Sequence, residues 1–165
     1  MQKLLILSTG GTIDKVYFDA LSEYQVGEPV AAQTLNDMNV AFEFELKEIC
    51  RKDSLELTDE DRETLRQALS DSDCQHILIT HGTDTMVNSA NVIAQHVKET
   101  SKVVIFTGAM TPSAFKDSDA TFNIGTALGA MSVAAPGIYV AMSGKVYPAD
   151  QVFKNYDSRR FEAPK

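Results

Sequence analysis

The sequence predicts an α/β fold, a single-domain, three-layer sandwich with helices on both faces of a mostly parallel, doubly wound sheet of the flavodoxin or Rossmann type. Two observations predict it. Short apolar runs alternate four or five times with segments of helical periodicity along the chain. The first run, residues 4–7, is continuously apolar, which is typical of a parallel strand buried on both faces. Right-handed crossovers are expected between the strands.

The length of 165 residues fits one domain, expected to extend over residues 1–165. The chain has 15 Lys and Arg against 23 Asp and Glu, a net charge of -8. It therefore lacks the excess of basic residues that binding to nucleic-acid phosphates requires, and no nucleic-acid partner is expected. The first apolar run is too short for a signal peptide, and nothing later approaches the length of a membrane span. We therefore expect a cytoplasmic protein without a membrane partner.

The two cysteines, Cys50 and Cys74, lie far apart in the chain. The nearby His76 does not complete a zinc-site pattern with them, so the sequence predicts neither a metal site nor a disulfide framework. Both cysteines are interpreted as small packing residues.

The first half of the chain begins with the strand at residues 4–7, which a pair of glycines closes. Residues 12–27 mix charged and aromatic side chains and predict a long loop or a weak hairpin, a kind of segment that often serves as a functional lid. A short helix is expected over residues 30–38. Residues 42–49 alternate apolar and charged side chains, which predicts a strand with one wet face near the edge of the sheet.

The second half begins with a helix whose N-cap is Thr58 and whose capping-box residue is Asp61, with Leu65 and Leu69 on its apolar face. The pattern then predicts strands over residues 76–80, 102–107 and 137–142, alternating with helices over residues 86–97 and 122–133. Small residues in the last helix indicate close packing on the sheet. A turn is expected over residues 144–150.

Three of the predicted strands end in a threonine–glycine environment, at residues 9–12, 81–84 and 107–110. Glycine at such a corner lets a ligand approach main-chain NH groups, and a carboxylate or a developing oxyanion would suit these donors. The Walker and dinucleotide glycine patterns are both missing from the sequence, so nucleotide binding is weakly supported. A Gly-Gly-Thr corner alone is a weak signal and is more often a tight strand-to-helix turn.

Taken one at a time, the polar residues near these corners also have ordinary interpretations. Asp84 beside Thr83 would serve as a plain helix cap, and Asp53 with Ser54 as part of a turn. Lys154 and Tyr24 would be a solvated lysine and an exposed loop aromatic. A threonine hydroxyl is a poor nucleophile unless a base or its surroundings activate it, so composition alone does not assign a reaction.

Taken together, the motifs resemble the bacterial-type L-asparaginase family. Thr9-Gly10-Gly11-Thr12-Ile13 and His81-Gly82-Thr83-Asp84-Thr85-Met86 are similar to its two signature patterns, in that order along the chain. Further matches are Thr107-Gly108-Ala109-Met110-x-Pro112-Ser113, Tyr24-x-Val26-Gly27, Asp53-Ser54 ahead of the helix cap, Asp119-x-x-Phe122-Asn123, and Lys154.

The resemblance implies hydrolysis of the side-chain amide of L-asparagine to L-aspartate and ammonia through an acyl-enzyme, with some glutaminase activity. Carried over by position, Thr12 is the nucleophile and Tyr24 its partner. Thr83 is the second catalytic threonine, activated through Lys154 and Asp84, because an ammonium beside a hydroxyl favours the alkoxide. Which threonine attacks first stays open, and Thr12 is assigned.

The same resemblance implies the substrate-binding groups. Main-chain NH groups of Gly11 and Thr83 are candidates for an oxyanion hole. Ser54 matches the position that binds the substrate α-carboxylate, and Asp84 also receives the α-ammonium. The remaining residues carried over to the substrate site are Asp53, Gly82 and Ala109. No metal or organic cofactor is implied, and a homo-oligomer, a dimer or tetramer, is expected because sites of this family lie at subunit contacts.

Two departures from the family pattern qualify these expectations. Family members usually have about twice this length, with a smaller carboxy-terminal α/β domain. The chain is expected to be a naturally short member without that domain, and the alternative is a piece of a longer protein. Leu55 also stands where long periplasmic members carry a glutamine that contacts substrate.

Two rival functions remain open. A non-catalytic module with the same fold would bind an amino acid, and a flavodoxin-like domain would bind a nucleotide or act in signalling. The presence of both threonine loops together with Lys154 favours the enzyme. His81, the residue most easily taken for a general base, is expected to be structural and to hold the turn before Thr83.

Overall fold

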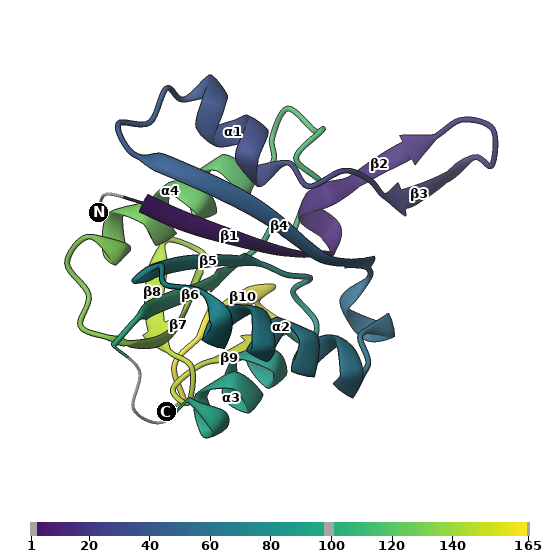
Figure 1. Cartoon of the computed structure of the whole chain (residues 1–165). Coiled ribbons are helices and arrows are strands. Elements are labelled where there is room, and N and C mark those ends of the chain that lie inside the picture. Colours follow the sequence, from purple (N-terminus) through teal and green to yellow (C-terminus); the bar gives the residue numbers. More distant parts are fainter. Residues whose placement is uncertain (1–2, 98–100, 165) are drawn as a thin grey trace.

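The computed structural model describes residues 3–97 and 101–164 of the chain. Its central sheet contains, in spatial order, β4 (Glu43–Lys52), β1 (Lys3–Gly10), β5 (His76–Thr80), β6 (Val103–Thr107), β7 (Gly137–Met142) and β8 (Lys145–Pro148) (Figure 1). The first five strands run parallel, and β8 pairs antiparallel with β7. The parallel strands therefore have the 2-1-3-4-5 order of flavodoxin-like sheets.

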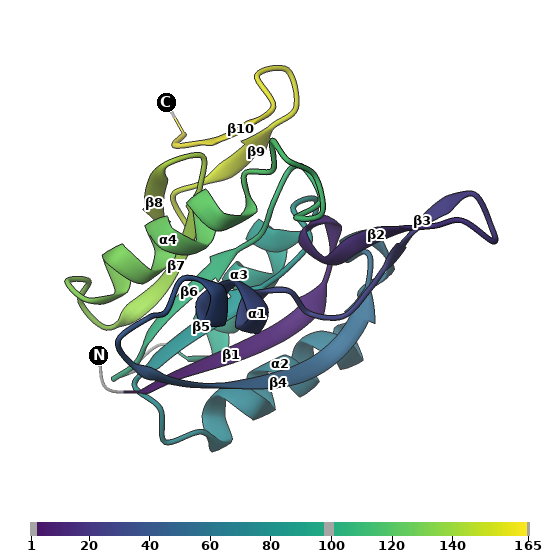
Figure 2. The same cartoon turned by 90° about the horizontal axis from the view of Figure 1, so that it is seen from above.

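Helices cover both faces of this sheet. The helices α1 (Ala31–Asp37) and α4 (Ala120–Met131) pack on one face, and α2 (Asp59–Asp71) and α3 (Met86–His96) pack on the other (Figure 2). The predicted three-layer α/β sandwich is confirmed. The predicted helices and strands of the sandwich begin and end within three residues of the positions expected from the sequence.

The central strands are buried on both faces, as their continuous apolar runs predict. In β1, Leu5 and Leu7 contact the cluster of α2 and α3, whereas Leu4 and Ile6 contact the cluster of α1 and α4. All four side chains are at most 4% exposed. The strand β4 lies at the edge, where the alternating pattern placed it.

One crossover differs in hand from the others. The connections β5–α3–β6 and β6–α4–β7 move in the same direction along the sheet, but α3 and α4 lie on opposite faces. The connections through α1 and α2 share the hand of the α3 connection. The expectation of right-handed crossovers throughout is therefore wrong, because residues 108–119 lead the chain over the carboxyl edge to the face of α1 before α4 begins.

Two small hairpins extend the sandwich. The segment predicted as a loop or weak hairpin is a hairpin of β2 (Lys15–Phe18) and β3 (Glu23–Val26), which projects from the body (Figures 1 and 2). A second hairpin, β9 (Phe153–Asn155) and β10 (Arg160–Glu162), was not predicted. Residues 144–150, expected as a turn, contain β8, because Ser143 and Gly144 both have positive φ and form a two-residue hairpin loop.

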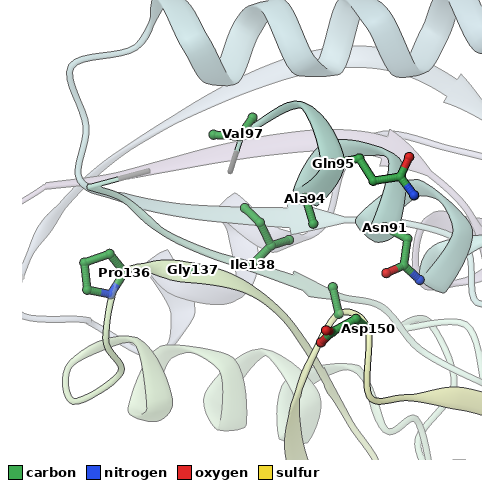
Figure 3. Close-up of a pocket in the computed structure, with 9 residues that line it drawn as sticks. Asn91, Ala94, Gln95, Val97, Pro136, Gly137, Ile138 and Asp150 are labelled. Carbon is green, nitrogen blue, oxygen red and sulfur yellow. The ribbon is translucent and has the colours of Figure 1, made fainter. Parts of the chain in front are cut away.

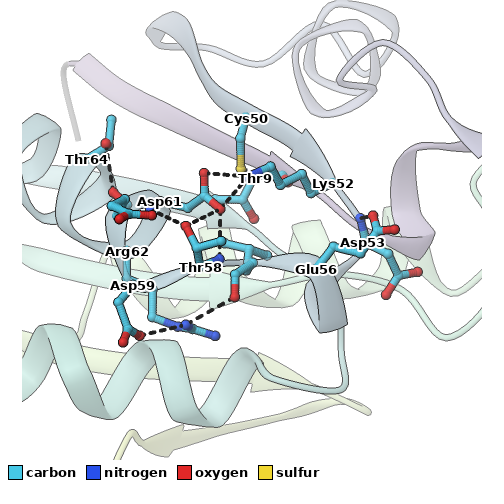
Figure 4. Close-up of polar contacts among 12 residues, drawn as sticks. Thr9, Cys50, Lys52, Asp53, Glu56, Thr58, Asp59, Asp61, Arg62 and Thr64 are labelled. Carbon is cyan, nitrogen blue, oxygen red and sulfur yellow. Dashed lines mark hydrogen bonds and ion pairs between the residues drawn. The ribbon is translucent and has the colours of Figure 1, made fainter.

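The predicted capping box of α2 is present (Figure 4). The Asp61 backbone NH donates to Thr58 Oγ1 at 3.2 Å, and the Thr58 backbone NH donates to Asp61 Oδ2 at 2.8 Å. Lys52 Nζ also donates to Asp61, at 2.7 Å, and so joins the end of β4 to the start of α2. This contact holds the 3₁₀ turn η2 (Ser54–Glu56) between them.

We expect Thr58→Ala to lower the free energy of unfolding by about 1 kcal/mol, because the first turn of α2 loses its cap. Urea unfolding followed by circular dichroism measures this change. Thr64→Ala in the same helix is the matched control. Its hydroxyl donates only to the Glu60 carbonyl, and alanine has the higher helix propensity. Equal destabilisation by both substitutions would contradict a role for the cap.

Candidate active site

The loops after β1 and β5 meet at the carboxyl edge of the sheet, beside the point where the strand order reverses. A Cβ atom on Gly11 would lie 2.3 Å from the Gly82 Cα, so no side chain fits between the two loops. Gly11 also has a φ of 95°, which favours glycine. Since Thr12 and Thr83 each follow one of these glycines, the two threonine loops adjoin, at the place where open α/β sheets bind ligands.

A third loop, residues 53–57, packs against the second. A Cβ atom on Gly82 would lie 2.6 Å from the Ser54 Cβ, and the Thr85 hydroxyl donates to the Ser54 carbonyl at 2.7 Å. The Ser54 side chain is 1% exposed, and its hydroxyl has no hydrogen-bond partner among the described residues. Leaving a buried hydroxyl unpaired costs about 1–3 kcal/mol, a cost that a hydrogen bond to a ligand would remove.

Lys154 joins this edge from a distant part of the chain. Its Nζ donates to Thr83 Oγ1 at 2.8 Å and to Asp84 Oδ1 at 2.6 Å. The Thr83 residue is buried, and the lysine side chain is 11% exposed, so water screens the contact with the threonine only weakly. The structure thus brings together three residues to which the family resemblance assigns catalytic roles.

The β9–β10 hairpin determines the direction of the Lys154 side chain. Phe161 is the cross-strand partner of Lys154 and is 2% exposed within the core beside α3. Partners of this kind share a face of the hairpin, so the lysine points toward the body of the protein. The Tyr147 hydroxyl donates to the Phe161 carbonyl at 2.9 Å and fixes the hairpin to β8.

His81 is fully buried and uses both ring nitrogens within the fold. Nδ1 lies 2.7 Å from the Gly82 carbonyl, which only accepts, so Nδ1 carries the proton. Nε2 then accepts from the Ser89 hydroxyl at 2.9 Å, and Ser89 accepts from Arg62 Nε at 3.0 Å. Burial lowers the pKa of His81 to about 4. The imidazole is therefore neutral and has no free nitrogen to act as a base.

A cavity of about 640 Å³ opens between the β2–β3 hairpin and the loops at the sheet edge. Three of the predicted site residues line it: Tyr24, Asp53 and Asp84. Leu55, which is 74% exposed, lines it as well. The other lining residues are Lys15, Gln25, Val26, Arg51 and Glu56.

The other predicted site residues lie outside the lining of this cavity. Thr12 is half-buried, and its hydroxyl makes no hydrogen bond to the part of the chain that the structure describes. The Ala109 side chain packs into the core beside α1 and α4, so only its main chain can reach a ligand.

A second cavity of about 420 Å³, lined by residues of α3 and the start of β7, contains none of the predicted site residues (Figure 3).

Tyr24 lies on β3 and is 49% exposed. Its ring makes edge contacts with Tyr17, at a centroid distance of 5.4 Å, and with Phe115, at 5.8 Å. Phe115 belongs to the loop that leads from β6 to α4. The β2–β3 hairpin therefore packs against this loop. Tyr24 lines the cavity and does not reach the contact between Thr83 and Lys154.

Lys15 is a cavity residue that the sequence did not single out. Its Nζ lies 2.6 Å from Asp53 Oδ2 and joins the base of the hairpin to the loop after β4. Burial raises the pKa of Asp53, but hydrogen bonds from Lys15 and from the Leu55 backbone outweigh it, so the net pKa is lowered. No sequence signal marks Lys15, because its partner lies in a distant part of the chain.

Asp14 is a second residue that sequence reasoning missed. It belongs to the 3₁₀ turn η1 (Thr12–Asp14), directly after the first threonine loop, and is 1% exposed. Its carboxyl group accepts from the Val30 backbone NH at 2.9 Å and from the Ser8 hydroxyl at 3.4 Å. Burial raises the pKa of Asp14 to about 6. The group therefore fixes the start of α1 to the turn that carries Thr12.

Both cysteines are free thiols. Cys50 donates to the Thr9 carbonyl at 3.4 Å, and Cys74 lies in the core. Within residues 3–97 and 101–164, no three His, Cys, Asp or Glu side chains are grouped to hold a metal ion. None of the helices in these ranges is long and apolar enough to span a membrane.

The fold and this cluster define a three-layer α/β protein with a threonine–lysine–aspartate site at the switch point of a parallel sheet. A family model described as "Asparaginase, N-terminal" matches residues 3–164. The chain belongs to the asparaginase family and corresponds to its N-terminal part.

Known proteins of two kinds resemble the chain. The L-asparaginase of Thermococcus kodakarensis is 31% identical over an alignment of 161 positions, which covers 92% of this chain and 47% of the relative. The solved structure of the L-asparaginase from this organism superposes with a TM-score of 0.85 at 28% identity, over 98% of this chain and 51% of that one. A subunit of the glutamyl-tRNA(Gln) amidotransferase of Archaeoglobus fulgidus is 33% identical over an alignment of 176 positions, which covers 94% of this chain and 40% of the relative. The chain thus spans about half the length of these relatives or less.

We expect Gly11→Ala to lower the free energy of unfolding by at least about 2 kcal/mol, because the methyl group meets the Gly82 backbone and φ is positive. Thermal and urea unfolding measure the loss. Gly129→Ala is the matched control, since nothing lies within 4 Å of the added methyl group in α4. That variant should gain about 0.5–1 kcal/mol from helix propensity. A wild-type unfolding midpoint for Gly11→Ala would contradict the close contact of the loops.

Asp14 should make stability depend on pH. Because its pKa is about 6 in the folded protein against an ordinary 3.8, the folded state holds the proton more tightly. The free energy of unfolding should therefore fall by about 2 kcal/mol as pH rises from 4 to 7, on account of this group. Asp14→Asn should remove that part of the fall. Urea unfolding across this pH range measures it, with Asp19→Asn on the exposed hairpin tip as the control. Parallel pH curves for Asp14→Asn and the wild type would refute the assignment.

Proposed function

We propose that the chain hydrolyses the side-chain amide of L-asparagine to L-aspartate and ammonia through a threonine acyl-enzyme. The observation that carries the proposal is the contact of Lys154 with both Thr83 and Asp84, beside the loop of Thr12. A binding module has no need of an ammonium held against a buried threonine hydroxyl. Membership of the asparaginase family supports the same reaction.

In the first step, the Thr12 oxygen attacks the amide carbon, and an acyl-threonine ester replaces the C–N bond. The hydroxyl proton leaves with the nitrogen as ammonia, with Tyr24 as the partner of Thr12 once the hairpin closes over substrate. Negative charge develops on the amide oxygen. Backbone NH groups of Gly11 and Thr83 are the proposed donors to it, and one such donor contributes about 3 kcal/mol in other hydrolases.

In the second step, water attacks the ester carbon and the bond to Thr12 breaks. The Lys154 ammonium favours the alkoxide form of Thr83, and this oxygen takes the proton of the attacking water. The proton then returns to Thr12 as aspartate leaves. Asp84 holds the lysine in place through the 2.6 Å contact.

The substrate backbone occupies the cavity beside Asp84. We assign its α-ammonium to the Asp84 carboxylate, which lines the cavity. We assign its α-carboxylate to the unpaired hydroxyl of Ser54, which stands in the chain between the lining residues Asp53 and Leu55. Asp53, Gly82 and the main chain of Ala109 complete the proposed contacts. Expected partners are the small-molecule substrate and further copies of the chain, in a dimer or tetramer.

Glutamine is a second candidate substrate. The similarity to a subunit of a glutamyl-tRNA(Gln) amidotransferase favours it, because that relative is named for the transfer of an amide group and glutamine carries the same side-chain amide as asparagine. The bond to be broken is the same, so the same residues serve either substrate. A panel of free and peptide-linked amides distinguishes the two.

We expect ammonia release from L-asparagine to fall by at least about 1,000-fold in Thr12→Ala and in Thr83→Ala, with folding intact by circular dichroism. A coupled ammonia assay measures it. Thr126→Ala is the control, since this hydroxyl donates only to the Phe122 carbonyl on the exposed side of α4. Full activity of both site variants would refute the assignment. Stabilisation by L-aspartate without turnover of any amide would favour the binding module.

A further inference from the structure

The Lys154 cluster contains a residue that neither the motifs nor the proposed reaction assign. Tyr156 lies two residues after the lysine, in the turn of the β9–β10 hairpin. Its hydroxyl donates to Asp84 Oδ1 at 3.2 Å, the same oxygen that accepts from Lys154. Its ring centroid lies 4.9 Å from Lys154 Nζ. One side chain therefore contacts both charged members of the cluster.

These contacts complete the surroundings of the ammonium. A lysine ammonium has three donor hydrogens and a flexible stem, and holding it in one position costs about 2 kcal/mol of side-chain entropy. Thr83 and Asp84 each take one hydrogen bond from it. The tyrosine ring lies within the range of a cation–π contact and takes the remaining side. The cluster thus holds the lysine on three sides.

The turn that carries Tyr156 is itself tightly bonded. Asn155 Oδ1 accepts from the backbone NH groups of Asp157 and Ser158, at 3.0 and 3.3 Å. Glu162 accepts from Asn155 Nδ2 at 3.0 Å and from the Ser158 hydroxyl at 2.5 Å. These bonds close the turn around Tyr156, although the tyrosine itself is 65% exposed. An exposed aromatic ring fixed in this way points to a role at the site that it touches.

We propose that Tyr156 is a positioning residue, whose hydroxyl fixes the Asp84 carboxylate and whose ring fixes the Lys154 ammonium. The proposal rests on the proposed function for its effect on turnover, but the contacts stand without it. The hydroxyl acts on the group assigned to the substrate α-ammonium, and the ring acts on the group that activates Thr83. Lys154 keeps its own bond to Asp84 when the hydroxyl is removed, so loss of the hydroxyl changes mainly KM, whereas loss of the ring also changes kcat.

The first experiment compares Tyr156→Phe, which keeps the ring, with Tyr156→Leu, which removes ring and hydroxyl. With L-asparagine as substrate, we expect Tyr156→Phe to raise KM about fivefold with little change in kcat. Tyr156→Leu should raise KM similarly and also lower kcat about fivefold. The control is Tyr139→Phe, which removes a hydroxyl that donates to the Ala135 carbonyl at 3.0 Å, in β7. Wild-type constants for both Tyr156 variants would overturn the proposal and leave the asparaginase function standing.

The second experiment measures the contact between the Tyr156 hydroxyl and the Asp84 carboxylate without an activity assay. Burial and the neighbouring Asp84 carboxylate raise the pKa of the Tyr156 phenol above its ordinary value. NMR titration of ¹³C-tyrosine-labelled protein should show raised pKa values for Tyr147 and Tyr156. The Tyr156 signal is the one absent from Tyr156→Phe, and its pKa should return toward the ordinary value in Asp84→Asn. An unshifted Tyr156 signal in the wild type would overturn the proposal.

If the wild type hydrolyses no amide, the proposed function fails, and the affinity for L-aspartate then tests the role of Tyr156. Calorimetry should show binding about fivefold weaker in Tyr156→Phe than in the wild type and in Tyr139→Phe. Equal affinities in all three proteins would overturn the positioning role.

Discussion

At the edge where β1 and β5 end, the backbones of Gly11 and Gly82 lie so close that a methyl group on Gly11 would come within 2.3 Å of the Gly82 Cα. The rest of the site depends on this contact. It sets the loop of Thr12 beside the loop of Thr83, and the approach of Gly82 to Ser54 adds the loop after β4. A side chain at either glycine would push these loops apart. Both glycines matter because they have no side chain, which lets the loops approach each other. The amino-acid composition does not reveal such a role.

The crossover of opposite hand supplies the second constraint. Because α4 lies on the face of α1, residues 108–119 must cross the carboxyl edge after β6. The crossing loop is held by Asp119, which accepts from the backbone NH groups of Met110 and Thr111, and by the bond from the Ser113 NH to the Ile13 carbonyl at 3.2 Å. Phe115 in this loop then meets Tyr24 of the hairpin. A crossover of the usual hand would keep these residues on the face of α3 and leave the hairpin without this support.

Much of the fold was predictable because it follows from local pattern. Continuous apolar runs mark the strands that are buried on both faces, and the Thr58–Asp61 spacing marks the start of α2. The hand of the α4 crossover was not predictable, since the general preference for right-handed connections is the only sequence-level guide. The short strands β8, β9 and β10 carry too few residues for a periodic signal. Within the site, the adjoining threonine loops follow from motif order, whereas the Lys15–Asp53 pair, the buried Asp14 and the Tyr156 contacts arise only when distant segments meet.

Lys154 shows how far the site depends on packing outside it. The lysine is 71 residues from Thr83 in the chain and reaches it only through the β9–β10 hairpin. Two strands of three residues are not stable alone, so the hairpin depends on the buried Phe161 and on the bond from the Tyr147 hydroxyl. The position of the ammonium is therefore coupled to core packing beside α3 rather than to the loops it serves. The contact between the two glycines fixes the threonine loops, whereas the β9–β10 hairpin, held by the core, positions Lys154. Local unfolding of that hairpin would therefore move the lysine away from Thr83 while the sheet stays folded.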